Sequence, residues 1–179
     1  YDICNGIAMG TNGSIFVVGS TKSGGWVSGG FDTNYGANLA HDAFVTCLDA
    51  TGTNFLWSTY LGGGGEDFGN AIAVDAVGNI VAVGVTTTPN WVAGGYNTNA
   101  SRLNGYYNEG FIVKLSPGGF HLWSSYLGGA GDETAHAVAT DAAGNIYVGG
   151  ETWANAGATN NWLVGNLRTN YIGAGPQAF

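Results

Sequence analysis

The chain is built from a segment that occurs three times, and this repeat restricts the possible folds more than any other feature. Residues 58–86 align without a gap with residues 124–152, at an offset of 66 positions. Residues 1–21 align with the second copy at an offset of 65, and the loop WVSGGFDTN at 26–34 recurs as WVAGGYNTN at 91–99. Such a recurring unit predicts one supersecondary structure that stacks on copies of itself.

Each unit is predicted to contain four short strands and no helix. In the second unit, the alternation of apolar and polar residues predicts strands at residues 71–75, 79–85, 110–115 and 121–127. The turn DAVGN at 75–79, which recurs as DAAGN at 141–145, combines an aspartate that can bond the turn backbone with a glycine that adopts positive φ. Four antiparallel strands in a repeated unit are typical of a β-propeller blade.

We therefore expect an all-β fold of three four-stranded antiparallel modules, arranged as propeller-type blades in an open array or partial propeller. The predicted blades are residues 1–65, 66–131 and 132–179, which form one repeat-built domain over residues 1–179. The third blade is expected to be shortened. It lacks most of the loop between its second and third strands, and also the turn between its third and fourth strands.

Several motifs of these units resemble those of a known family. They are DAFVTCLDATG at 42–52, STYLGGGGEDFGNAIAVDAVGNIVAVG at 58–84, GFIVKLSPGG at 110–119, SSYLGGAGDE at 124–133 and DAAGNIYVGG at 141–150. At these residues the chain resembles the bacterial SBBP (seven-bladed β-propeller) repeat family, and the turn between the first two strands is similar to that of NHL-type repeats. The resemblance implies a secreted or surface-exposed bacterial protein with a scaffold or binding role, and it implies no catalytic residues.

The composition limits the partners and the location of the protein. Four basic and twelve acidic residues give a formal net charge of -8, which disfavours nucleic acid and anionic membranes as partners. The sequence has no apolar run of about 18 residues, so we expect no membrane span. Only 9% of the residues are charged, which leaves a surface of Asn, Thr, Ser and Gly. Such a surface suits an extracellular or cell-surface protein, or one whose faces are covered by neighbours.

Three units are too few to close a ring, because propellers have about four to eight blades. The first and last modules would therefore each leave a sheet face uncovered. Head-to-tail contact between copies would cover both faces and give a ring or a filament. Our leading hypothesis is thus an extracellular self-assembling repeat protein. A secreted module that binds carbohydrate or protein is the alternative, and a fragment of a larger closed propeller is the third.

Two pairs of adjacent carboxylates follow glycine runs and are candidates for a calcium site. They are Glu66 with Asp67, and Asp132 with Glu133. Calcium prefers hard oxygen ligands on a flexible backbone, which these segments could supply. In the other interpretation, the carboxylates accept hydrogen bonds from backbone N–H groups of a turn between blades. No other cofactor is expected.

Aromatic residues in the long loops are the candidates for contact with a ligand or partner. Exposed aromatic side chains mark interaction sites, and they also stack on sugar rings. In a second interpretation, the two tryptophans of this set fold back over their own blade instead. The candidates are Trp26, Phe31, Tyr35, Trp91, Tyr96, Tyr106 and Tyr107.

The remaining candidates are modification sites. Cys4 and Cys47 lack metal-binding spacing, so they are either two buried thiols or one disulfide. Asn12 and Asn99 begin acceptor sequences for glycosylation. Neither HExxH nor GxSxG occurs in the sequence. We therefore expect no enzymatic activity and no catalytic residues.

Overall fold

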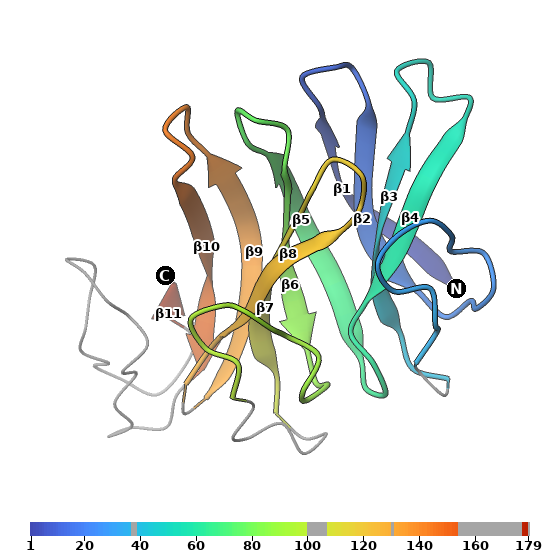
Figure 1. The fold of residues 1–179 in the computed structure, drawn as a ribbon. Helices are drawn as coiled ribbons and strands as arrows, with labels where there is room; N and C mark the ends of the chain where they lie inside the picture. The colour runs from blue at the N-terminus through green and yellow to red at the C-terminus, as the bar shows by residue number, and fades with distance from the viewer. Residues whose placement is uncertain (37–38, 100–106, 130, 154–176, 179) are drawn as a thin grey trace.

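The computed structural model describes residues 1–36, 39–99, 107–129, 131–153 and 177–178, and these lie in strands, turns and loops (Figure 1). Sheet 1 has the strand order β1 (Asp2–Met9), β2 (Ile15–Thr21), β3 (Asp42–Leu48), β4 (Phe55–Leu61). Sheet 2 has the order β5 (Asp67–Val74), β6 (Ile80–Thr86), β7 (Glu109–Leu115), β8 (His121–Leu127). Sheet 3 has the order β11 (Gln177–Ala178), β10 (Ile146–Trp153), β9 (Asp132–Thr140).

All neighbouring strands pair antiparallel, so sheets 1 and 2 are four-stranded meanders with the same order. The predicted all-β fold of propeller-type blades is confirmed. In the third module the described residues form three strands, and residues 154–176, where its remaining predicted strands fall, lie outside the described part of the chain. No helix long and apolar enough to cross a membrane occurs among the described residues.

The hairpin turns repeat one geometry. In the first turn of sheet 2, Gly78 donates its N–H to the Asp75 carbonyl at 2.9 Å and has φ of 90°. The Asp75 side chain accepts the N–H groups of Val77 at 3.1 Å and Asn79 at 2.8 Å. This is the role that the sequence predicted for the aspartate and the glycine of this turn.

The first strand of each sheet contains a β-bulge, which lengthens it beyond the prediction. Strand β5 begins at Asp67, four residues before the expected residue 71, because a register shift between Gly69 and Ala71 leaves Asn70 as an extra residue. The same shift occurs between Cys4 and Gly6 in β1. Bulges increase twist and redirect a side chain out of the ladder, so each sheet carries one redirected side chain at the same place.

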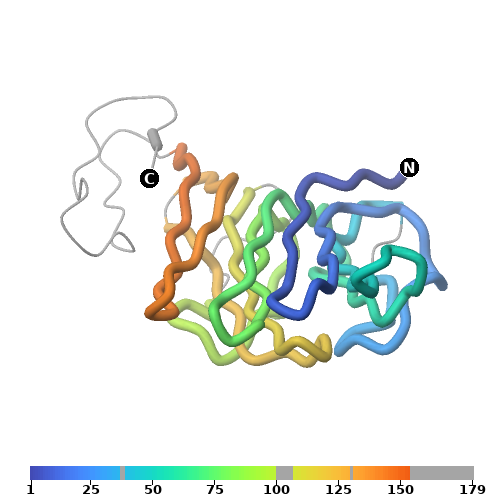
Figure 2. Tube along the Cα trace, turned by 90° about the horizontal axis from the view of Figure 1, so that it is seen from above, coloured from blue at the N-terminus to red at the C-terminus, as the bar shows by residue number. Residues whose placement is uncertain are grey.

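The three sheets pack face to face in chain order. Strand β1 lies beside β5 and β5 beside β9, and Figure 2, viewed from above, shows the sheets following one another along the chain. We call the side that a sheet turns towards the following sheet its front face, and the opposite side its back face.

Two apolar cores lie between these faces. Between sheets 1 and 2, the front-face residues Phe16, Val18 and Val45 pack against the back-face residues Ile80 and Leu115. The second core joins the front face of sheet 2 to the back face of sheet 3, and it contains Val81, Val83, Ile112, Ala135 and, partly buried, Val148. A fully buried side chain of this size stabilises the fold by about 1.5–3 kcal/mol. Packing between sheets is therefore a major source of stability.

Candidate interaction surfaces

The back face of sheet 1 is an apolar surface that no described residue covers. Ile7 and Met9 on β1 are 70% and 69% exposed. Their counterparts in sheet 2 are Ile72, which is only 8% exposed, and the partly buried Val74, and both pack against sheet 1. The back face of sheet 1 thus exposes apolar residues at the positions that are buried on the back face of sheet 2.

The front face of sheet 3 is open in the same way. Tyr147 on β10 is exposed, whereas its counterpart Val81 is fully buried between sheets 2 and 3. Ala137 and Ala139 on β9 are also exposed. The described part of the chain therefore has one uncovered back face and one uncovered front face.

The bulged residues link one sheet to the next. Asn5 donates its side-chain N–H to the Gly69 carbonyl at 2.9 Å, and Asn70 donates to the Ala135 carbonyl at 2.9 Å. The third bulged residue, His136, is exposed and lies 3.1 Å from a Glu151 carboxylate oxygen. This contact was not among the features predicted from the sequence, although Asn5 aligns with Asn70 at the 65-residue offset.

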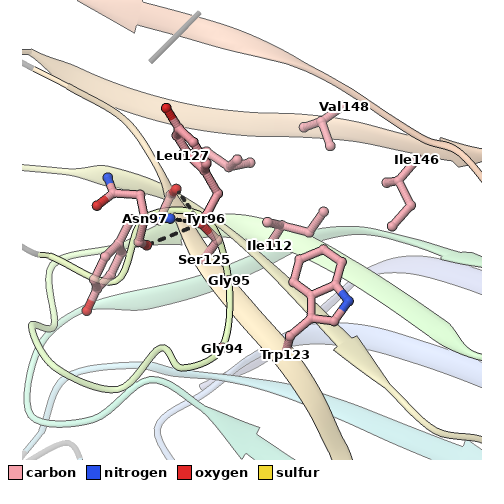
Figure 3. A pocket seen from close by; sticks show the side chains of 11 residues that line it. Gly94, Gly95, Tyr96, Asn97, Ile112, Trp123, Ser125, Leu127, Ile146 and Val148 are labelled. Atoms are coloured by element: carbon pink, nitrogen blue, oxygen red, sulfur yellow. Dashed lines mark hydrogen bonds between the residues drawn. The ribbon is translucent and has the colours of Figure 1, made fainter. Parts of the chain in front are cut away.

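A groove of about 490 Å³ lies between sheets 2 and 3. Ile112 and Trp123 of sheet 2 face Ile146 and Val148 of β10 across it (Figure 3). The loop before β7 forms another side of the groove and brings Tyr96 there. The volume is within the usual range of small-ligand sites. Apart from Tyr96, its lining residues were missing from the site predicted from the sequence.

The two loop tryptophans fold back over their own sheets. The Trp26 ring packs edge-on against Phe44, with centroids 5.1 Å apart. Trp91 packs against Phe111 in the same way, also at 5.1 Å, and its indole N–H donates to the Thr86 hydroxyl at 3.1 Å. The interpretation of these tryptophans as parts of their own blade is therefore the one that matches the structure.

The other loop aromatics differ in exposure. Tyr35 donates its hydroxyl to the Ala40 carbonyl at 2.6 Å and is half-buried. Phe31 is 38% exposed and Tyr96 is 82% exposed. Tyr107 is exposed, and Tyr106 lies outside the described residues. Among the aromatic candidates that the structure describes, Tyr96 is thus the most exposed residue.

The first carboxylate pair is engaged by protein groups. Glu66 accepts the backbone N–H of His41 at 3.1 Å and lies 2.7 Å from its Nδ1. Asp67 is fully buried and accepts hydrogen bonds from the Thr86 hydroxyl, from the Thr88 hydroxyl at 2.8 Å and from the Gly63 N–H at 2.9 Å. Burial raises the pKa of Asp67, although these hydrogen bonds act in the opposite direction.

The second pair repeats this arrangement in part. Glu133 is fully buried and accepts the Thr152 hydroxyl at 2.9 Å and the Gly129 N–H at 3.2 Å. Asp132 accepts the Asn108 N–H at 2.8 Å. Within the described residues, no three His, Cys, Asp or Glu side chains are grouped as metal ligands would be. The contacts are those of the turn-capping interpretation.

Both cysteines are free thiols, so the structure does not show the disulfide of the two interpretations. Cys4 is exposed on β1 and Cys47 is buried on β3. Strand β2 lies between them, with Cys4 opposite Gly19 and Cys47 opposite Phe16. Two strand spacings amount to about 9.6 Å, beyond the Cα separation that a disulfide spans.

The glycosylation candidates lie at accessible positions. Asn12 is exposed in the first turn of sheet 1, where its side-chain oxygen accepts the Ser14 N–H at 3.0 Å. Asn99 is also exposed. The serine of its acceptor sequence, Ser101, lies outside the described residues.

Comparisons with known proteins bear on the repeat. The family model described as the SBBP β-propeller repeat matches residues 56–89 and 122–155. An uncharacterized WD repeat-containing protein of Acanthamoeba polyphaga mimivirus is 29% identical over an alignment of 154 residues, which covers 76% of this chain and 11% of the relative. The chain thus spans a small part of that relative's length. The family matches cover three of the five segments whose motifs carried the resemblance, at residues 58–84, 124–133 and 141–150.

Proposed function

This chain contains two SBBP β-propeller repeats, and from that premise we propose that it is an assembly module whose open sheet faces bind further copies head to tail. The exposed back face of sheet 1 supports this proposal most directly. Ile7 and Met9 lie there at the positions where Ile72 and Val74 pack against a preceding sheet. A second copy that presents the front face of its sheet 3 would cover them.

The internal packing favours head-to-tail contact over back-to-back contact. Front faces meet back faces at both interfaces within the chain, and the small Ala8 packs against the same core as the larger Ile72. The open front face follows this pattern, since Ala137 and Ala139 are small. A heterologous contact of this type adds copies without limit unless its rotation closes a ring.

Charge opposes the association and gives it a recognisable salt dependence. Each copy carries a formal net charge of -8, so two copies repel each other at low ionic strength. The proposed contact itself is apolar. Added salt screens the repulsion and leaves the apolar contact in place, so association should strengthen as salt is raised to physiological concentration.

Sedimentation of the full chain over a range of concentrations tests the proposal. We expect the native chain to form oligomers larger than dimers. Ile7→Glu places a charge on the back face of sheet 1, and Tyr147→Glu places one on the front face of sheet 3. Each variant should associate at least about tenfold more weakly than the native chain, because a carboxylate buried without a partner costs more than the 1.4 kcal/mol of a tenfold change.

Mixing the two variants provides the decisive measurement. Each variant keeps one intact face, so an equimolar mixture should form dimers of one Ile7→Glu and one Tyr147→Glu chain and nothing larger. Val77→Glu, at an exposed apolar residue in a turn away from both faces, is the matched control and should assemble like the native chain. A native chain that stays monomeric at every concentration, or a mixture that does not dimerise, overturns the proposal. A stable monomer would instead favour a part of a larger closed propeller.

Location and chemistry are part of the same proposal. We place the module outside the cell, on a bacterial surface, because only 9% of its residues are charged and its turns are rich in small polar residues. We assign it no enzymatic activity, since the buried carboxylates of the two candidate pairs, Asp67 and Glu133, accept hydrogen bonds from threonine hydroxyls within their own sheets. Glycans attached at Asn12 would project from a turn and away from the stacking faces.

A further inference from the structure

The groove between sheets 2 and 3 has a counterpart between sheets 1 and 2, and that counterpart is filled by the chain itself. There the Trp57 indole N–H donates to the Pro117 carbonyl at 3.0 Å. A Cβ on Gly119 would lie 2.7 Å from the Trp57 ring, so the glycine backbone rests directly on the indole. The Phe31 ring packs on His121 with centroids 5.2 Å apart. The turn between β7 and β8 thus occupies a site made of Trp57 and Phe31.

Sheet 2 carries the same pair of aromatic residues at the same positions. Trp123 aligns with Trp57, and Tyr96 aligns with Phe31. Trp57 is buried at 6% exposure, whereas Trp123 is half-exposed and Tyr96 extends into solvent. The indole N–H of Trp123 has no hydrogen-bond acceptor among the described residues.

The supporting loop has the same geometry at both sites, which makes the open groove a built site. Ser124 donates its N–H to the Ala93 carbonyl at 2.7 Å, as Ser58 does to the Ser28 carbonyl at 2.8 Å. The Ser125 hydroxyl holds the loop by accepting the Asn97 N–H at 2.9 Å (Figure 3). These bonds fix the loop that brings Tyr96 beside the groove.

The third module lacks the turn sequence that fills the site between sheets 1 and 2. In the alignment it has no counterpart of the turn SPGGF at residues 116–120. The groove thus has Trp123 and Tyr96 at the positions that hold the SPGGF turn in the first site, but the sequence contains no second SPGGF turn.

We propose that the groove binds a proline-glycine-glycine turn of a partner polypeptide. The glycine backbone of that turn would rest on the Trp123 ring, and its proline carbonyl would accept the Trp123 indole N–H. The histidine at the second position after the glycines, the counterpart of His121, would pack against Tyr96 as His121 packs against Phe31. The contact of Pro117 and Gly119 with Trp57 is the precedent for this binding within the chain. This site is distinct from the stacking faces.

A cyclic peptide containing Ser-Pro-Gly-Gly-Phe-His is the probe, because cyclisation preorganises the turn. Its binding to the full chain can be followed by calorimetry. We use the Ile7→Glu background, in which stacking is blocked, so that failure here is distinguishable from failure of the assembly proposal. We expect saturable binding of one peptide per chain.

Three changes should each weaken binding by tenfold or more. They are Trp123→Ala in the protein, Tyr96→Ala in the protein, and replacement of the second peptide glycine by alanine. Tyr96→Ala cannot act by unfolding the chain, because that side chain is 82% exposed. Trp153→Ala, at another exposed tryptophan, is the matched control and should bind like the parent. Absence of peptide binding, equal binding of the alanine peptide, or binding of oligosaccharides in its place overturns the proposal.

Discussion

At the scale of single residues, the buried aspartates show how the hydrogen-bond partners of a carboxylate set the direction of its pKa shift. Burial alone would raise the pKa of Asp75, but the hydrogen bonds from Lys114 and Asn79 outweigh it and lower the pKa to about 2. Asp67 has threonine hydroxyls and backbone N–H groups as partners, and its burial dominates, so its pKa is raised. Asp75, which has a cationic partner, therefore stabilises the fold in its charged form. Asp67, which has none among the described residues, stabilises it in its protonated form.

Asp75→Asn should destabilise the chain by about 1–3 kcal/mol near neutral pH, because it removes a buried charge-assisted contact. The Asp75 carboxylate lies 2.9 Å from the Lys114 ammonium and is 3% exposed. Urea unfolding measures the loss. Asp141→Asn, the same change in the exposed equivalent turn without a lysine, is the control and should cost much less.

The pH dependence of this loss follows from the lowered pKa. The stability that Asp75 contributes is complete above its ordinary pKa of 3.8 and disappears as the pH falls through about 2. The difference between the native chain and Asp75→Asn should therefore shrink as unfolding is measured at progressively lower pH. A difference that stays constant down to pH 2 would contradict the ion pair as its source.

Glu133 should give the opposite slope. Burial raises its pKa above the ordinary 4.5, against the hydrogen bonds of Thr152 and Gly129, so the folded chain holds this proton more tightly than the unfolded chain. Its contribution is complete below pH 4.5 and is lost as the pH rises through the raised value. Glu133→Gln, which stays neutral and can still accept from Thr152, should flatten this decline in urea midpoints. An unchanged decline would assign it to other groups.

At the scale of strands and turns, much of each sheet could be predicted from the sequence. The alternation of residues places β6, β7 and β8 within one residue of their observed bounds. The start of β5 was wrong because an extra residue at Asn70 interrupts the pairing without ending the strand. A bulge interrupts the alternation of residues by which a strand is recognised in a sequence. Only a comparison of the repeated units shows it. The open groove was missed because it depends on packing between modules.

The second strand of each sheet has a glycine opposite the bulge, and in sheet 2 a larger residue does not fit there. A Cβ on Gly84 would lie 1.9 Å from the Phe68 carbonyl oxygen and 2.8 Å from the Phe111 ring. Gly84→Ala must therefore displace backbone, and we expect a loss of about 1–3 kcal/mol or more in urea unfolding. Gly64→Ala, where a Cβ meets nothing within 4 Å, is the control and should change stability by about 0.5 kcal/mol at most.

At the scale of the whole molecule, the repeat explains both the fold and its open faces. Two family matches and a repeated strand order confirm the SBBP-type propeller blades inferred from the motifs. Uncovered faces could be expected from the count of units. The contacts that join one sheet to the next could not, because the bulged side chains act across sheets and their direction depends on the bulge.

The bulged residues predict a specific contact between stacked copies. Asn5 and Asn70 each donate to a carbonyl of the following sheet, at Gly69 and Ala135. In a head-to-tail pair, His136 of one copy would take this donor position, and the Cys4 carbonyl of the next copy would take the place of Gly69. His136→Ala should then weaken association by about two- to tenfold, the equivalent of one hydrogen bond.

Replacement by asparagine makes this test specific, because it restores the residue that the other two sheets use. His136→Asn should associate at least as strongly as the native chain in sedimentation, while His136→Ala associates more weakly. Glu151→Gln removes the partner that lies 3.1 Å from His136 within the same sheet, and it should leave association unchanged. If Glu151→Gln weakens association as much as His136→Ala, the effect arises within the sheet. The bulge would then not be the link between copies.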